Sequence, residues 1–226
     1  LKEISPALDQ IEAATELIAP RRMDVIRITC EPTFALKWLV TALGDFNRNW
    51  PDIEVRIDTS HEIMNLQTGE FDLAIRCCSQ PVQGLESDVI SSSPVYPVGT
   101  PQLFNSSIDL EEPTTLLSIP LLAQNHPELW QGWFQKTGLP QSRLKKTSGG
   151  LKTMLAIEAA AAGQGLALVS MELVHNDIKA GRLVKFSDTG LDYGAYYIVY
   201  TKAAGKRKSV AAFREWLLEA SKELRP

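Results

Sequence analysis

The fold is decided by residues 30–57, which read CEPTFALKWLVTALGDFNRNWPDIEVRI. Residues 25–29 just before them predict a short buried strand. Residues 33–50 place apolar side chains on one side of a helix, namely Leu36, Leu39, Val40, Leu43, Phe46 and Trp50. Beyond Pro51, the apolar residues Ile53, Val55 and Ile57 alternate with charged ones, which is the period of a strand. The stretch therefore predicts strand, tight turn, helix and strand.

The α/β alternation continues on both sides of this stretch. Residues 61–68 predict a short helix ended by Gly69, and residues 71–76 a third strand, so the first unit predicts a mostly parallel sheet covered on both faces. The second unit predicts strands at 95–99, 121–123, 165–170 and 182–186. Its helices are expected at 129–137, 151–162 and 171–180, with one opened by Thr100-Pro101 and a loop region at 109–120. A strand at 196–201 and a helix at 209–224 capped by Ser209 complete the chain.

Residues 1–20 carry apolar or small side chains at heptad spacing, at Leu1, Ile4, Leu8, Ile11, Thr15 and Ile18. One interpretation is an amphipathic helix packed on its own domain. The other, which the abrupt end at Pro20 favours, is a linker helix that dimerises.

Composition excludes several classes of protein. The chain has 226 residues, 44% of them hydrophobic, and a net charge of −4, so no DNA binding is expected from this part of the protein. Neither a long apolar span nor a signal segment is found, so no membrane contact is expected. The odd set of three cysteines, Cys30, Cys77 and Cys78, fits a reducing cytoplasm rather than a disulfide framework.

Motifs for catalysis are missing from the sequence. The histidines His61, His126 and His175 lie far apart, without a cysteine or carboxylate at metal-ligand spacing, and each is expected to be a surface or locally bonded residue. Neither a nucleophile elbow nor a phosphate-binding loop occurs. The chain is therefore expected to be no enzyme and to carry no metal or cofactor.

Several motifs in order resemble one family, over essentially the whole chain. They are the Pro32-Thr33-Phe34-Ala35 and Lys37-Trp38-Leu39 run, Pro51-Asp52-Ile53, residues 71–76, 97–101, 157–168 and 180–184, and residues 213–217. The chain resembles the effector domain of LysR-type transcriptional regulators, in the branch of the glycine-cleavage activators and β-lactamase regulators.

The resemblance implies an α/β, two-lobed fold like that of type 2 periplasmic binding proteins, with a hinge of two crossing strands and a preceding linker helix. Lobe I would comprise residues 21–98 and 200–226, lobe II residues 99–199, and the linker and dimerisation helix residues 1–20. The DNA-binding winged helix-turn-helix lies outside this chain. The expected function is to sense a small-molecule effector in a cleft between the lobes and to form dimers or tetramers in the cytoplasm.

A ligand in such a fold binds beyond the carboxyl ends of the strands. The residues expected to line the site are Cys30, Thr33, Phe34, Thr59, Ser60, His61, Arg76, Cys77, Gly99, Gln124, Ser148, Gly149, Gly150, Lys152, Thr153 and Tyr196. Helix N-termini expected at Thr33 and Gly150 suit a negative group, which predicts an anionic or zwitterionic effector. Thr33 and Lys152 could equally be a plain helix cap and a solvated lysine.

The sequence also departs from the branch at Glu31, at Thr41 and in residues 148–153, so the effectors of relatives are not transferred to it. An alternative from another class is a periplasmic solute-binding protein of the same fold. The heptad segment and the odd cysteine count speak against that alternative.

Overall fold

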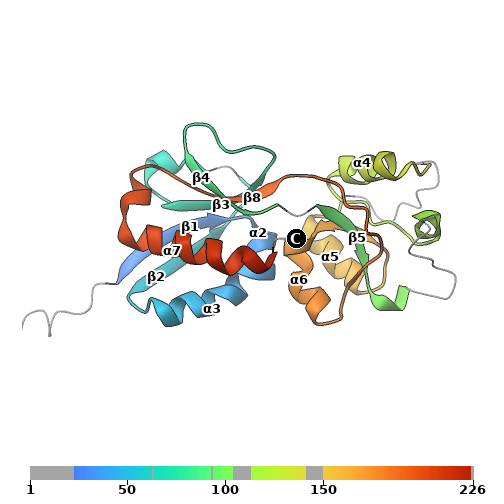
Figure 1. The fold of residues 1–226 in the computed structure, drawn as a ribbon, viewed down its shortest axis with the longest axis horizontal. Helices are drawn as coiled ribbons and strands as arrows, with labels where there is room; N and C mark the ends of the chain where they lie inside the picture. The colour runs from blue at the N-terminus through green and yellow to red at the C-terminus, as the bar shows by residue number, and fades with distance from the viewer. Residues whose placement is uncertain (1–22, 63, 93, 104–112, 141–149, 225–226) are drawn as a thin grey trace, which may run out of the picture.

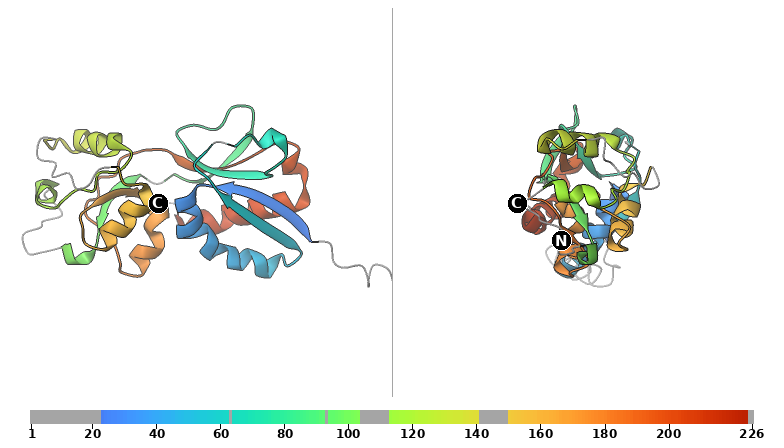
Figure 2. Two further views of the ribbon diagram at one scale, coloured as in Figure 1. Left: turned by 180° about the vertical axis from the view of Figure 1, so that it is seen from behind. Right: turned by 90° about the vertical axis from the view of Figure 1, so that its right-hand side faces the viewer.

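The computed structural model describes residues 23–62, 64–92, 94–103, 113–140 and 150–224. The predicted linker helix therefore lies outside the described residues. The chain forms two lobes side by side along its longest axis, joined by two segments of chain (Figure 1). The view from behind shows the same division (Figure 2).

Lobe I is built on a five-stranded sheet with the order β2-β1-β3-β8-β4. Its strands are β1 (Asp24–Cys30), β2 (Ile53–Thr59), β3 (Leu73–Cys78), β4 (Glu86–Ser91) and β8 (Ala195–Tyr200). The strand β1 pairs in parallel with β2 and β3, as the sequence predicts, whereas β8 runs antiparallel to both β3 and β4. The sequence did not predict β4.

One face of this sheet is covered by the helical segment after β1 and by the last helix. These are α2 (Pro32–Phe34), the π-helical turn η1 (Ala35–Leu39), α3 (Val40–Asn49) and α7 (Lys208–Ala220), which is followed by η7 (Ser221–Leu224). The buried side chains Trp38, Phe46 and Phe213 fill the space beneath them. Two expectations are corrected here, because Leu36 and Val40 are 62% and 57% exposed instead of packed on the sheet.

Lobe II is built on a three-stranded antiparallel sheet with the order β6-β5-β7. Its strands are β5 (Val95–Gly99), β6 (Ala167–Ser170) and β7 (Val184–Lys185), and its helices are α4 (Pro127–Thr137), α5 (Thr153–Ala161) and α6 (Met171–Lys179). Tryptophans of α4, Trp130 and Trp133, form the centre of a second apolar cluster. Four short helical turns complete the described chain: η2 (Leu66–Thr68), η3 (Pro101–Leu103), η4 (Pro113–Ser118) and η6 (Ala204–Lys206).

The crossings between the lobes come earlier in the chain than the sequence predicts. The strand β5 belongs to the second sheet from Val95 onward, and β8 belongs to the first sheet from Ala195 onward. The predicted boundaries at 98/99 and 199/200 therefore fall within these strands or at their ends. A boundary of this kind depends on which partner a strand pairs with, and a local pattern of side chains does not specify the partner.

Other elements differ in extent. The predicted helix at 61–68 is limited to η2, which ends at Gly69 with φ 76°. Residues 121–123 contribute a single bridge, from Leu121 to Leu166, instead of a strand. The helix opened by Pro101 is the short turn η3. Within the described residues, no helix is both long and apolar enough to cross a bilayer.

Candidate functional site

A carboxylate occupies the start of the first helix. Glu31 is the cap residue of α2, and its Oε2 accepts the Phe34 N–H at 2.8 Å. Its Oε1 accepts the Thr33 hydroxyl at 3.0 Å, and Thr33 itself is only 2% exposed. The donors expected to meet a ligand are thus engaged by the protein. Sequence reasoning missed Glu31 as a site residue, although an acidic residue before a proline at a helix start is a capping signal.

The aromatic residues expected at the site, Phe34 and Tyr196, do lie together. Their rings stack with 4.5 Å between centroids, and both side chains are buried. Burial raises the pKa of the Tyr196 hydroxyl well above its ordinary value, and the nearby Glu31 carboxylate adds to the effect. Tyr196 is therefore a neutral packing residue that fixes the beginning of β8 to lobe I.

The ends of β1 and β2 converge beside Glu31. The Ser60 N–H donates to the Cys30 carbonyl at 3.0 Å, and the exposed His61 has its Nδ1 3.7 Å from Glu31 Oε1. Cys30 is buried, and burial raises the pKa of its thiol to about 12. Thr59 at the end of β2 is exposed. The predicted neighbourhood of Cys30, Ser60 and His61 is thus present around a carboxylate.

Arg76 and Cys77 point to opposite faces at the end of β3. Arg76 is buried and its Nη2 donates to the Thr29 hydroxyl at 2.6 Å and to the Glu62 carbonyl at 3.1 Å, so it supports the loop after β2. Burial lowers its pKa. Cys77 is accessible, yet protein surrounds it enough to raise its pKa to about 12, and the Glu172 carboxylate of α6 contributes next. The thiol of Cys77 in lobe I is thus influenced by a carboxylate of lobe II.

Lobe II and the second crossing together contribute a polar cluster of Tyr193, His126 and Glu128. The Tyr193 hydroxyl is 3.1 Å from His126 Nδ1 and donates to Glu128 Oε1 at 3.4 Å, while His126 and Glu128 are 3.0 Å apart. Burial raises the pKa of Tyr193 to about 12, with contributions from Glu128 and then Cys77. Sequence reasoning missed Tyr193, Glu128 and Glu172, whose approach depends on tertiary contacts. It described His126 correctly as locally bonded.

The remaining lobe II residues lie at strand ends next to α5. Gln124 is buried, and its Oε1 accepts the Leu168 N–H at 2.9 Å. Gly150 has φ 80°, where a side chain would also approach Asn125. The helix α5 begins at Thr153 with Lys152 as its cap, so the helix N-terminus expected at Gly150 comes three residues later. Ser148 and Gly149 lie outside the described residues.

Gly99 lies apart from the other residues predicted to line the site. It sits at the end of β5 far from the hinge, where an added Cβ would lie 2.7 Å from Leu166, so close packing explains the glycine. A surface hollow of about 450 Å³ also lies elsewhere on lobe II, between Thr100, Gly163 and Arg182. Within the described residues, no group of three potential metal ligands occurs. The Glu31 carboxylate and the cluster of Tyr193, His126 and Glu128 offer polar groups for binding.

Comparisons with known proteins identify the family. Residues 21–222 match the family model described as LysR substrate binding domain. The glycine cleavage system transcriptional activator of Escherichia coli K12 is 29% identical over 219 residues, which are 96% of this chain and 71% of that protein. The transcriptional activator AmpR of Pseudomonas aeruginosa is 28% identical over 197 residues, 87% of this chain and 66% of that protein.

Solved structures agree with this assignment. The effector domain of AmpR from Pseudomonas aeruginosa has a TM-score of 0.72 at 26% identity and covers 88% of this chain and 95% of that chain. CrgA from Neisseria meningitidis has a TM-score of 0.73 at 19% identity, covering 98% of this chain and 77% of that chain, which is a likeness of fold. The predicted two-lobed α/β fold is thus confirmed, and the chain belongs to the LysR substrate-binding domain family of transcriptional regulators, which are not enzymes.

Proposed function

We propose that the chain senses a small molecule held between its lobes and passes a change of lobe angle to the rest of a LysR-type regulator. The convergence on Cys77 supports this. Its thiol is accessible, the carboxylates of Glu172 and Glu31 contribute to its raised pKa, and Cys77 in turn contributes to the raised pKa of Tyr193. Glu31 belongs to lobe I, Glu172 to lobe II and Tyr193 to the second crossing. A ligand here contacts both lobes at once.

The group of the effector that meets lobe I is a hydrogen-bond donor or a positive charge. The Phe34 N–H and the Thr33 hydroxyl already donate to Glu31, so a ligand carboxylate would meet Glu31 instead of open donors. Each carboxylate oxygen keeps a further acceptor position. Of the two predicted classes, this favours a zwitterion with its ammonium toward Glu31. Its anionic end would lie toward Lys152 and the start of α5, where N–H groups and the helix dipole favour negative charge.

LysR regulators bind effectors and DNA and self-associate. For this protein we expect DNA binding through a winged helix-turn-helix outside the chain, action in the cytoplasm, and dimers or tetramers. The exposed Leu36 and Val40 of lobe I and the exposed Leu155 of lobe II are suited to contact a second copy. Family membership does not favour the alternative of a periplasmic solute-binding protein.

A ligand screen followed by calorimetry tests the proposal. A thermal-shift screen of amino acids, nucleobases and cell-wall fragments supplies a stabilising compound. We expect Glu31→Gln to weaken that compound at least roughly tenfold, since a hydrogen bond to a charged group is lost. The matched control is Glu54→Gln, which removes a carboxylate of lobe I that pairs with Arg56 on β2.

A second experiment tests where on the protein the compound binds. The compound should slow alkylation of Cys77 by iodoacetamide, since the thiol lies where the ligand is expected. Equal affinity of the wild type and both variants would remove Glu31 from the site. Binding without protection of Cys77 would place the effector elsewhere.

A further inference from the structure

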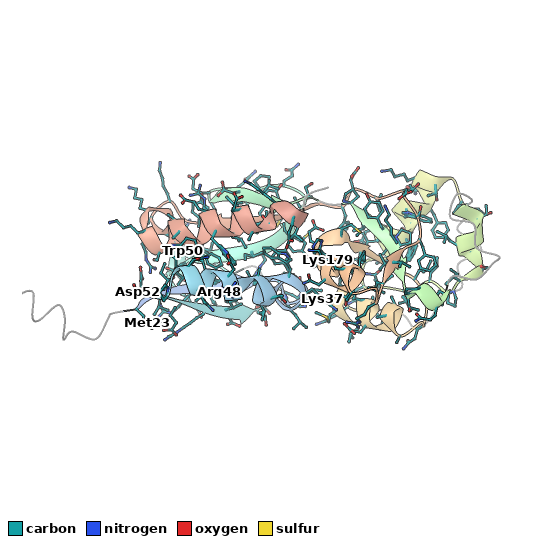
Figure 3. All side chains as sticks on the ribbon, turned by 60° about the horizontal axis from the view of Figure 1, so that its bottom comes forward. Met23, Lys37, Arg48, Trp50, Asp52 and Lys179 are labelled. Atoms are coloured by element: carbon teal, nitrogen blue, oxygen red, sulfur yellow. The ribbon has the colours of Figure 1, made fainter. Side chains whose placement is uncertain are left out.

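A four-residue ion network joins the two lobes on one side of the hinge. Lys37 of η1 places its Nζ 2.6 Å from Glu158 Oε1 of α5 and 3.1 Å from Asp177 Oδ2 of α6. Arg182 contacts the same two carboxylates, with Nη2 2.8 Å from Glu158 and Nη1 2.7 Å from Asp177. We call these four residues the ionic latch. Lys37 is its one member from lobe I, and Figure 3 shows it at the junction of the lobes.

The ionic latch is more buried than an ordinary surface salt bridge, and its charges balance. The side chains of Lys37 and Asp177 are 11% and 8% exposed. Two carboxylates face two cations, so the network is neutral only while Lys37 is in place. If the lobes separated there, Asp177 would keep Arg182 alone, shared with Glu158. A buried carboxylate left short of a partner is costly, which favours the observed lobe arrangement.

The backbone at Lys37 adds a second contact. Asn176 of α6 donates its Nδ2–H to the Lys37 carbonyl at 3.0 Å. Lys37 lies in the middle of the π-helical turn Ala35–Leu39, and turns of this kind are frequent at functional sites in helices. Further along α6, Lys179 lies 3.4 Å from Glu223 of η7, although both side chains are mostly exposed. Lys37 thus gives α6 a largely buried charged contact with lobe I, beside Leu173 and Val174 of α6, which belong to the same apolar cluster as Trp38.

We propose that the ionic latch sets the angle between the lobes in the unliganded protein, and that an effector acts by changing the stability of this contact. The proposal rests on the proposed function in one respect, that the effector works through lobe movement. A ligand shifts such an equilibrium only by its different affinity for the two arrangements. The stronger the latch, the larger the difference in the effector's affinity for the two lobe arrangements must be for the protein to switch.

The latch also lies next to the surface expected to contact a second copy. The exposed Leu36 and Val40 flank Lys37 in sequence, and the exposed Leu155 lies one helical turn before Glu158 on α5. The latch therefore fixes the two halves of a surface that spans both lobes. Releasing it separates those halves, which connects the lobe angle to assembly.

Distance measurement between the lobes tests the latch without any ligand. Spin labels are placed at the exposed positions Asn47→Cys of α3 and Gln135→Cys of α4, in a background of Cys77→Ser and Cys78→Ser. Labelled chains are diluted with unlabelled chains so that distances within one chain dominate. We expect Lys37→Met to broaden the distance distribution or to add a population absent from the wild type. Glu158→Gln should act in the same direction and, being half-exposed, should not impair folding.

The control is Lys185→Met, which removes a lysine paired with Asp188 within lobe II. It should leave the distribution unchanged. An unchanged distribution in Lys37→Met and Glu158→Gln would overturn the latch. Because these measurements need no effector, that failure would leave the proposed ligand site standing, and failure of the ligand experiments would leave the latch standing.

Discussion

Two residues of one helical segment hold the hinge region in different ways. Phe34 is fully buried and stacks on Tyr196, so the beginning of β8 is fixed to lobe I by packing. Three positions later, Lys37 reaches lobe II with a charged group. Dispersion contacts lose much of their energy over a gap of half an ångström or more, whereas Coulomb attraction falls off slowly with distance. The packed contact of Phe34 therefore tolerates almost no movement, whereas the ion pairs of Lys37 keep part of their attraction when the lobes shift.

The largest expected effect comes from breaking the rigid contact. Phe34→Ala removes a fully buried ring and leaves a cavity beside Tyr196, so the free energy of unfolding should fall by about 3–5 kcal/mol. Leu36→Ala, two residues away, should change it by less than about 0.5 kcal/mol because this side chain is exposed. Urea unfolding at a concentration where self-association does not contribute measures both. Similar losses for the two variants would refute the distinction between a packed and an open face.

An intermediate effect is expected at the carboxylate that caps this segment. Glu31→Ala leaves the Phe34 N–H and the buried Thr33 hydroxyl without their acceptor, so stability should fall by about 1–2 kcal/mol. Glu31→Ser should recover part of the loss, since serine is a favoured cap. The same urea experiment applies. An alanine variant as stable as wild type would show that water replaces the carboxylate fully and that Glu31 is retained for another reason.

The smallest effect on stability is expected at the adjustable contact, together with a dependence on pH. The hydrogen bond from Lys37 lowers the pKa of Glu158. The contribution of Glu158 is therefore fully present above the ordinary glutamate value of 4.5 and is lost as the pH falls through the lower folded value. Glu158 is half-exposed, so solvent screening limits this contribution to about 0.2–1 kcal/mol.

Glu158→Gln tests that assignment. Urea unfolding of wild type and variant is compared near neutral pH and below 4.5, the ordinary glutamate value. The difference between the two proteins should shrink progressively as the pH falls through the lowered folded pKa of Glu158, since the wild-type carboxyl becomes protonated over that range. A difference that stays constant across this range would mean that the carboxylate contributes through packing alone.

Local pattern predicted most of lobe I and much of lobe II, because periodicity and stop residues are local. Gly69 and Gly138 end their helical turns in the left-handed conformation, and residues 208–224 bury the expected Phe213 and Trp216. The sequence was less informative about which strands pair with each other. The edge strand β4 contains Glu86 and Asp88 and lacks a clear alternation of apolar residues. It is a strand because it pairs with β8.

The sequence predicted which strand ends lie together, but not the contacts that their side chains make. Strand ends at Cys30, Ser60 and Cys77 do meet, as sheet topology requires. The role of Glu31 as the acceptor of the Thr33 and Phe34 donors depends on a side-chain rotamer. The electrostatic effect of Glu172 on Cys77, and of Cys77 on Tyr193, depends on how lobe II sits on lobe I. Likewise, Leu36 and Val40 fit the apolar pattern of a buried helix face yet lie outside the core, since the pattern does not say which neighbour covers it.

The place of β8 in the first sheet has a consequence for how the chain is made. This strand lies between β3 and β4, and its register joins Cys78 to Ala195 across the whole of lobe II. A ribosome therefore completes every strand of lobe II before it completes the sheet of lobe I, and the slow long-range closure comes last. Until Tyr200 has emerged, β3 and β4 expose unpaired edges, where association between nascent chains would begin.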